Sequence, residues 1–200
     1  MTETNSLGFM ARWQKIARRI RVPLGFVAAG VYIYELYRHG AELRWIAWSL
    51  ALVVPGLWLR SYASGYVKKN SELTITGPYA HTRNPLYLGS MLMAAGFAVA
   101  LMRWPFAVVL VVGFAVIYVP VIASEEAFLH RTFEQFEWYC ARVPRLIPRI
   151  TPARSPVPTP GEAGRFSFAL YRKHREYNSA IGAALLYLSL FLGKYLHSLH

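Results

Sequence analysis

Five apolar stretches, set apart by polar or basic segments, constrain this sequence more than any other feature. They cover residues 22–37, 43–59 and 85–102, the stretch from Pro105 to Ala123, and residues 180–196. A helix needs about 20 mainly apolar residues to cross a bilayer, and stretches of this length fit that requirement. A hydrophobic fraction of 55% and a charged fraction of only 16% agree with it. The sequence predicts an all-α polytopic membrane protein with five transmembrane helices, in a single domain over residues 1–200.

Basic residues are distributed unevenly around these stretches. The chain has a formal net charge of +12 and no aspartate, and 18 of its 22 Lys and Arg fall before the first stretch, in 60–83 or in 124–178. The other four are Arg38, Arg44, Arg103 and Lys194. Because basic residues are retained on the cytoplasmic side, this predicts a cytoplasmic N-terminus and an outside C-terminus. We interpret the positive charge as an interaction with the lipid bilayer and anionic headgroups, and not with nucleic acid.

Several further features bear on processing and on the segments outside the spans. We expect no signal peptide, because the first residues lack a basic start and no small-residue cleavage site follows the first apolar run. Cys140 is the one cysteine, which excludes an internal disulfide and a cysteine metal cluster. Residues 13–21 predict an amphipathic helix on the membrane surface, and residues 151–164 predict a proline-rich linker.

The most distinctive polar segment is GPYAHTRNPLYLG, at residues 77–89. Asn84 is a residue type that caps helices, and Pro85 suits a first helical turn, so a helix is expected to begin at about residue 85. His81, Thr82 and Arg83 then lie at a helix N-terminus, where free N–H groups attract anionic or lone-pair-rich groups. The segment predicts either a site for a small polar ligand or simply the cap of a membrane helix.

A second group of charges follows the fourth span. Glu125 and Glu126 begin a stretch with aromatic residues at helical spacing, which is expected to continue as a helix to about Val143. It is followed by VPRLIPR, at residues 143–149. The topology brings these carboxylates to the same membrane face as Arg83 and the arginines of VPRLIPR, either to pair with them or to bind a ligand.

These motifs, in this order around a helical hairpin, resemble those of the integral-membrane isoprenylcysteine carboxyl methyltransferases and the related phospholipid methyltransferases. The resemblance covers residues 77–149. It implies an S-adenosylmethionine-dependent methyltransferase with a helical membrane fold and a cofactor pocket on the cytoplasmic face, which releases S-adenosylhomocysteine. It also implies a lipophilic or prenylated substrate that enters from the bilayer, and no metal.

The resemblance also implies roles for individual residues. Its motifs assign catalytic roles to Arg83, Glu126 and Arg145. The cofactor-binding residues that it implies are Tyr79, His81, Thr82, Arg83, Asn84, Pro85, Tyr87, Leu88, Gly89, Glu125, Glu126, Tyr139, Val143, Pro144, Leu146, Ile147 and Pro148.

The methyl acceptor is left open at this point. A carboxylate, such as that of an isoprenylcysteine-like thiol-acid, is already nucleophilic and needs only an arginine such as Arg83 or Arg145 to orient it. An amine needs a base, for which Glu125, Glu126 or His81 are candidates.

Other classes of function also stay open. A phospholipid or amine N-methyltransferase is the main alternative, and a membrane sterol reductase with a nicotinamide cofactor is a more distant one. A non-catalytic scaffold or lipid-binding protein is a third, because Glu134 follows Phe133 where the family usually has glycine. A transporter is disfavoured, since the charges gather at one membrane face and not at the midplane.

Overall fold

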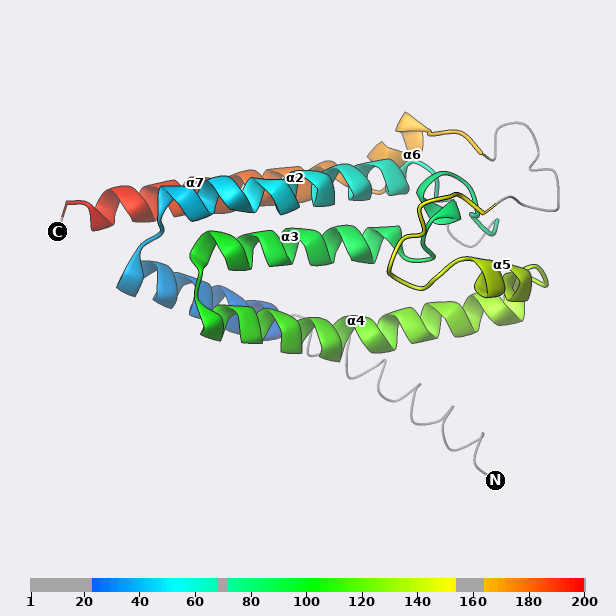
Figure 1. Ribbon diagram of the computed structural model, residues 1–200, viewed down its shortest axis with the longest axis horizontal. Coiled ribbons are helices and arrows are strands. Elements are labelled where there is room, and N and C mark those ends of the chain that lie inside the picture. Colours follow the sequence, from blue (N-terminus) through cyan, green and yellow to red (C-terminus); the bar gives the residue numbers. More distant parts are fainter. Residues whose placement is uncertain (1–22, 68–71, 154–163, 200) are drawn as a thin grey trace, which may run out of the picture.

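The computed structural model describes residues 23–67, 72–153 and 164–199, and within these ranges it contains helices and no β-strand (Figure 1). This confirms the all-α prediction. Residues 13–21 and most of the proline-rich linker lie outside the described residues. The elements are a helix over residues 23–39, α2 (Leu43–Ser64), the 3-10 helix η1 (Gly77–Ala80), α3 (Pro85–Leu101), α4 (Trp104–Thr132), α5 (Phe136–Arg142), α6 (Phe168–Lys173) and α7 (Tyr177–His197).

Three helices in the described part of the chain are long and apolar enough to cross a membrane, namely α2, α4 and α7. The apolar helix α3 has 17 residues, which corresponds to about 26 Å of helix. It lies between α2 and α4 in Figure 1. The count of five spans stays a prediction.

Glycines allow α2 and α3 to approach closely. A Cβ atom added to Gly96 would lie 2.4 Å from Val53 Cγ2, and one added to Gly56 would lie 2.7 Å from the Gly89 carbonyl oxygen. Small residues at such crossings permit van der Waals contact between helices in a membrane, where no hydrophobic force drives them together.

The turn between α3 and α4 is as tight as predicted. Met102 takes a left-handed conformation (φ 50°) and donates its N–H to the Ala98 carbonyl at 2.8 Å. Arg103 then returns to an extended conformation, and Pro105 lies in the first turn of α4, where its missing N–H is not needed. The two helices form the predicted antiparallel hairpin.

The prediction of one helix from the fourth span to about Val143 is wrong. Helix α4 runs through Glu125 and Glu126 and ends at Thr132. The next residue, Phe133, has an extended backbone (φ −126°, ψ 113°). The chain turns here, and α5 begins at Phe136. This break lets Phe136, Tyr139 and Val143 pack with Ile75 in a small core apart from the membrane helices.

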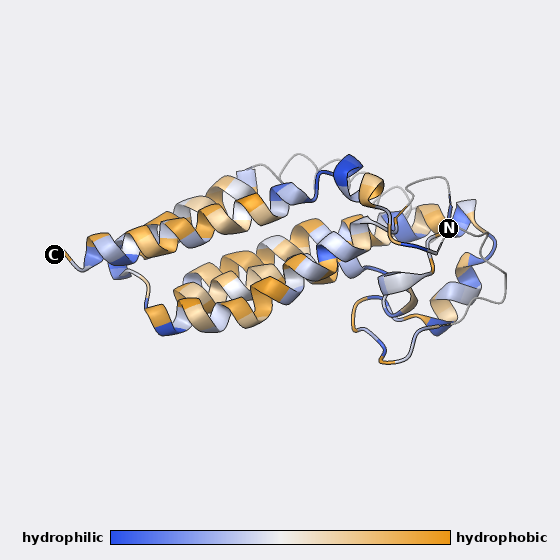
Figure 2. Ribbon diagram, turned by 90° about the horizontal axis from the view of Figure 1, so that it is seen from above, coloured by the Kyte–Doolittle hydropathy of each residue, from blue (hydrophilic) through white to orange (hydrophobic). Residues whose placement is uncertain are grey.

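The two ends of the bundle differ in polarity. Gly40 approaches the His197 ring at one end, which also holds the α3–α4 turn. The polar segments around η1 and α5 lie at the opposite end, and Figure 2 shows hydrophilic residues gathered there. Near the first end, Glu35 is buried with its carboxylate 3.7 Å from His39 Nε2. The motifs therefore share one end, as predicted, and the orientation of that end in a membrane stays a prediction.

Candidate functional site

A cavity of about 430 Å³ opens at the polar end of the bundle. Its walls come from the last turns of α2, the segment before α3, the first turn of α3, the second half of α4, α5 and the residue that precedes α7. The sequence-predicted site residues that line it are Tyr79, Arg83, Asn84, Pro85, Tyr87, Glu125, Glu126 and Tyr139. The hairpin thus brings together two motifs that lie about 40 residues apart.

One wall is held by backbone hydrogen bonds between two segments far apart in the chain. Arg83 N–H donates to the Pro144 carbonyl at 2.9 Å, and Arg149 N–H donates to the His81 carbonyl at 3.0 Å. Ala153 N–H donates to the Ala80 carbonyl at 2.9 Å. The VPRLIPR segment therefore lies along residues 80–84 and fixes the loop from which Arg83 projects.

Polar side chains of the loop reinforce this arrangement. Thr82 Oγ1 donates to the Arg145 and Leu146 carbonyls at 3.2 and 3.1 Å, and His81 Nδ1 lies 2.8 Å from the Arg149 carbonyl oxygen. Asn84 occupies the N-cap position of α3, but its side chain makes no cap hydrogen bond; Nδ2 donates to the Arg145 carbonyl at 3.0 Å. Asn84 is therefore the N-cap residue of α3, as predicted, but its side chain binds the VPRLIPR segment and does not cap the helix.

Glu126 is the charged centre of the cavity. Its carboxylate accepts a hydrogen bond from Arg145 and lies 3.5 Å from Arg83 Nη1. The side chain of Glu126 is 12% exposed, whereas that of Arg145 is 52% exposed. The hydrogen bond to Glu126 raises the pKa of Arg145 above its ordinary value. Beside this network, Tyr87 donates its hydroxyl to Glu125 at 2.9 Å.

Three buried polar atoms around the cavity lack a hydrogen-bond partner: Tyr79 Oη, Arg83 Nε and Glu126 Oε1. Burial raises the pKa of Tyr79, so this phenol stays protonated and available as a donor. Burial also raises the pKa of Tyr139, which donates its hydroxyl to the Tyr79 carbonyl at 2.8 Å. A buried polar atom without a hydrogen bond costs about 1–3 kcal/mol. Glu126 Oε1 has only its 3.5 Å ion pair with Arg83 Nη1, so two donors and one acceptor in this state point to a ligand that forms hydrogen bonds with them.

Acidic residues outnumber basic ones in the cavity lining, whereas basic residues outnumber acidic ones in the whole chain. Four of the chain's ten acidic residues line it, together with two arginines, although the chain as a whole has a net charge of +12. The lining glutamates are Glu72, Glu125, Glu126 and Glu176, and the arginines are Arg60 and Arg83. Such a lining favours a ligand with positive charge that also offers an anionic group to an arginine.

The other predicted residues lie outside the cavity lining. Gly89 faces α2, where an added Cβ would meet Arg60 Cγ at 2.6 Å, and Val143 is buried beside Phe136. Ile147 is 82% exposed. The remaining predicted residues that do not line the cavity are His81, Thr82, Leu88, Pro144, Arg145, Leu146 and Pro148. Their assignments as binding or catalytic residues stay predictions.

Sequence reasoning missed several lining residues. Glu176 lies beyond the proline-rich linker, and Arg60 lies in the last part of α2, so neither belongs to the recognised motifs. No local pattern marks them. The other lining residues that were not predicted are Val67, Glu72, Leu73, Thr74, Leu86, Ile117, Tyr118, Val121, Phe128, Leu129 and Phe136.

Comparison with known proteins finds one family and two curated relatives that the sequence matches. Residues 45–135 match the model of the family described as phospholipid methyltransferase, in agreement with the resemblance drawn from the motifs. Together with the apolar helices, the match indicates an integral membrane protein. No solved structure matches the chain.

Two curated relatives carry names that refer to metals. The chain is 37% identical over 99 residues to the nickel-cobalt-cadmium resistance protein NccN of Alcaligenes xylosoxydans xylosoxydans, which covers 50% of this chain and 46% of the relative. It is 36% identical over 95 residues to the cobalt-zinc-cadmium resistance protein CzcN of Cupriavidus metallidurans, which covers 48% of this chain and 43% of the relative. The match thus spans less than half the length of either relative. In the described ranges, no group of three or more His, Cys, Asp or Glu side chains is arranged to hold a metal ion.

Proposed function

We propose that this protein is a membrane methyltransferase that uses S-adenosylmethionine to methylate a lipophilic acceptor. The observation that carries the proposal is the set of three buried polar atoms without a hydrogen bond around an acidic cavity, on Tyr79, Arg83 and Glu126. All three residues lie in the segment that matches the phospholipid methyltransferase family.

The cavity residues fit the cofactor's chemical groups. S-adenosylmethionine, when bound, supplies a methyl group on a positively charged sulfur, and it also carries an ammonium and a carboxylate. The excess of glutamates in the lining favours the two positive groups, and Glu126 Oε1 is available to accept from the ammonium. Arg83 Nε and Tyr79 Oη are available to donate to the carboxylate or to other acceptors.

Positioning and exclusion of water are the main contributions of the chain to methyl transfer. Ile117, Tyr118 and Val121 of α4 form an apolar part of the lining beside Glu125. An acceptor with a carboxylate requires no proton removal, and in this proposal Arg83 orients it. An amine acceptor requires a base, and in that case the proposed base is Glu125, whose Oε1 accepts a hydrogen bond from Tyr87.

Two classes of acceptor follow from this arrangement. A lipophilic carboxylate, such as an isoprenylcysteine-like thiol-acid, is our first candidate and is supported by Arg83. A phospholipid or another amine is the second, and the glutamate-rich lining and the description of the matching family support it. Each class is tested by transfer of a radiolabelled methyl group from S-adenosylmethionine, with purified protein, to paired lipophilic acids and amines. Transfer to neither class by folded protein that binds the cofactor would contradict the proposal.

We also propose that the polar end of the bundle, with the N-terminus, faces the cytoplasm and that the C-terminus lies outside. Arg83 and Arg145 lie at the polar end, whereas Arg38 and Lys194 belong to the segments at the opposite end. Labelling of single cysteines introduced at each end of the bundle in intact cells tests this orientation.

A role in metal tolerance is a second candidate function, favoured by the printed names of both relatives. It is compatible with methylation of a membrane component. Growth of cells on cobalt, nickel and cadmium, with the wild-type gene or with Glu126→Gln, tests it. Equal growth of the two strains under each metal would show that any effect of the protein on metal tolerance does not depend on the proposed methyl transfer.

A further inference from the structure

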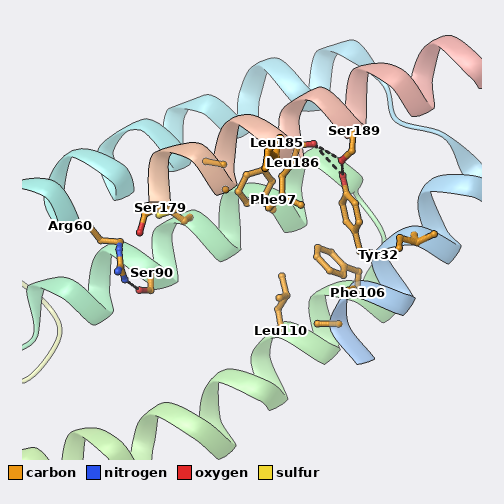
Figure 3. Close-up of a pocket in the computed structure, with 16 residues that line it drawn as sticks. Tyr32, Arg60, Ser90, Phe97, Phe106, Leu110, Ser179, Leu185, Leu186 and Ser189 are labelled. Atoms are coloured by element: carbon orange, nitrogen blue, oxygen red, sulfur yellow. Dashed lines mark hydrogen bonds between the residues drawn. The ribbon is translucent and has the colours of Figure 1, made fainter. Parts of the chain in front are cut away.

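The apolar part of the bundle ends near Arg60. A cavity of about 840 Å³ between the helix over residues 23–39, α3, α4 and α7 is lined by apolar side chains, apart from Arg60 and a few hydroxyl groups. Figure 3 shows Arg60 at one end of this cavity and Tyr32 at the other. Arg60 Nη1 donates to the Leu86 carbonyl at 3.4 Å, so it lies beside the first turn of α3. Charged side chains near the ends of membrane helices lie at the boundary between hydrocarbon and head groups, which places this boundary at about the start of α3.

The segment after α5 returns to this boundary. Figure 1 shows the chain beyond α5, in yellow, running back toward the start of α3. Two backbone hydrogen bonds hold it there, from Arg83 N–H to the Pro144 carbonyl and from Arg149 N–H to the His81 carbonyl. Residues 145–148 therefore form a loop that is fixed at both ends. Because the residues that hold it directly precede α3, the loop lies at the level of the lipid head groups.

Two isoleucines of this segment are almost fully exposed. Ile147 is 82% exposed, and Ile150, at 96%, is the most exposed of the large apolar residues in the described part of the chain. Transfer of such side chains from water to an apolar medium is favourable. The segment thus presents two apolar side chains at the level where the bilayer begins.

Arginines flank these isoleucines. Residues 138–153 contain Arg142, Arg145 and Arg149 and no acidic residue. Arg145 is bound to Glu126, but neither Arg142 nor Arg149 forms an ion pair with a carboxylate in the described ranges. Arg149 Nη1 donates to the Arg142 carbonyl at 2.8 Å, which keeps the two arginines together. Basic groups beside inserted apolar side chains are complementary to anionic phospholipids.

We propose that residues 142–150 form a contact with the bilayer surface, in which the two isoleucines insert among the head groups while Arg142 and Arg149 bind anionic phospholipids. This assigns Ile147 to the lipid and not to the cofactor. The same segment holds the loop of Arg83 and places Arg145 on Glu126, so the contact also fixes one wall of the acidic cavity. The effect on the cavity rests on the proposed function, whereas the insertion does not.

A fluorescent probe at position 147 tests the insertion. The dye NBD is attached to Ile147→Cys in a Cys140→Ala background, in nanodiscs of phosphatidylcholine and phosphatidylglycerol. Glu134→Cys is the matched control, because Glu134 is exposed between α4 and α5, at the end of the molecule in Figure 1. We expect lipids with a nitroxide near the head group to quench NBD at position 147, and aqueous iodide to quench it at position 134. Iodide quenching that is equally strong at both positions would overturn the inference and leave the surface to a soluble partner.

Photolabelling of the protein with its own cysteine in place tests the choice of lipid. Phosphatidylglycerol and phosphatidylcholine, each with a diazirine at the start of an acyl chain, are compared in nanodiscs, and labelled residues are mapped by mass spectrometry. We expect labelling at residues 147–150 to favour phosphatidylglycerol, and Arg142→Gln to reduce this preference by about fivefold, the effect of one basic residue near an anionic surface. Arg131→Gln, at an exposed arginine in the last turn of α4, is the control. Equal labelling by the two lipids in the wild type would contradict the anionic partner.

Titration with S-adenosylhomocysteine separates this inference from the proposed function. We expect Ile150→Ser to weaken its binding by about fivefold in nanodiscs with phosphatidylglycerol, at the low end of the usual coupling between two sites. In detergent micelles, which lack anionic head groups, the wild type is expected to bind as weakly as this variant. The same loss in micelles and nanodiscs would indicate a direct effect on the cavity and contradict the coupling through lipid. If the wild type binds no S-adenosylhomocysteine in either medium, the proposed function fails, and the probe at position 147 still decides the insertion.

Discussion

Arg60 and Glu176, 116 positions apart in the sequence, form a two-pronged ion pair in which Nη2 lies 3.0 and 2.9 Å from the two carboxylate oxygens. Arg60 Nε also donates to Glu176 at 3.1 Å. The pair joins the last turns of α2 to the start of α7, and the two side chains are only 22% and 12% exposed. Parallel hydrogen bonds of this kind are stronger and more directional than a single contact.

We predict that Glu176→Gln lowers the free energy of unfolding by about 2 kcal/mol, because it leaves the half-buried Arg60 charge without its counter-ion. Glu137→Gln is the matched control. Glu137 is 78% exposed and 3.6 Å from His130 Nε2, so its loss is expected to cost less than about 0.5 kcal/mol. The free energy of unfolding of both variants is measured in mixed micelles. Equal values for the two would show that the ion pair between Arg60 and Glu176 does not stabilise the packing of α7.

Variants of Tyr79 and Tyr139 are expected to affect different properties, ligand binding in the first case and stability in the second. Tyr79 Oη has no hydrogen-bond partner, so we expect Tyr79→Phe to keep the wild-type stability within about 0.5 kcal/mol and to weaken binding of S-adenosylhomocysteine. Tyr139→Phe removes a hydrogen bond to the Tyr79 carbonyl and is expected to cost about 1 kcal/mol. Thermal unfolding and calorimetric titration of both variants test this. Unchanged binding by Tyr79→Phe would remove that hydroxyl from the site.

The stability of the polar end is expected to fall at alkaline pH. Burial raises the pKa of Tyr79 and Tyr139 above the ordinary value of about 10, so the folded state holds these protons more tightly than the unfolded state. Their contribution is complete below about pH 10 and is lost as the pH rises above that value. The double variant Tyr79→Phe/Tyr139→Phe should lose stability less steeply with pH in this range. Identical slopes for the double variant and the wild type would contradict the assigned cause.

The close contact between α2 and α3 also yields a prediction. A Cβ atom at Gly96 would lie 2.4 Å from Val53 Cγ2 and 3.0 Å from the Ser49 carbonyl oxygen, so Gly96→Ala must push the helices apart and is expected to cost about 2 kcal/mol. Gly113→Ala meets no atom within 4 Å and is expected to be neutral or stabilising by up to about 1 kcal/mol. Unfolding of the two variants in micelles gives the comparison, and a Gly96→Ala protein as stable as Gly113→Ala would contradict the packing.

Local signals in the sequence predicted the parts of the fold that local chemistry determines. Pro85 begins α3 as its type suggests, and Pro105 likewise lies in the first turn of α4, where proline is tolerated. Helix α7, Tyr177–His197, contains the whole apolar stretch that predicted it. For α3 and α7, the run of apolar residues gave the approximate extent of the helix.

Features that depend on distant contacts were not predictable in this way. Asn84 is a good capping residue, yet its amide pairs with the Arg145 carbonyl, because the VPRLIPR segment packs against this loop and offers a fixed acceptor. The break at Phe133 arises because Phe136 and Tyr139 pack against Ile75, about 60 residues earlier. Glu176 joins the site through Arg60, and no spacing within the motifs indicates that contact.

The most direct test of the account is calorimetric titration of the detergent-purified protein with S-adenosylhomocysteine, beside NADPH as a control cofactor. Glu126→Gln and Glu134→Gln are the matched variants, because Glu126 is at the centre of the acidic cavity whereas Glu134 is exposed between α4 and α5. We predict saturable binding of S-adenosylhomocysteine alone, weakened about tenfold or more by Glu126→Gln and unchanged in Glu134→Gln. A folded protein that binds neither compound, or that binds S-adenosylhomocysteine equally well in both variants, would contradict the proposed methyltransferase site.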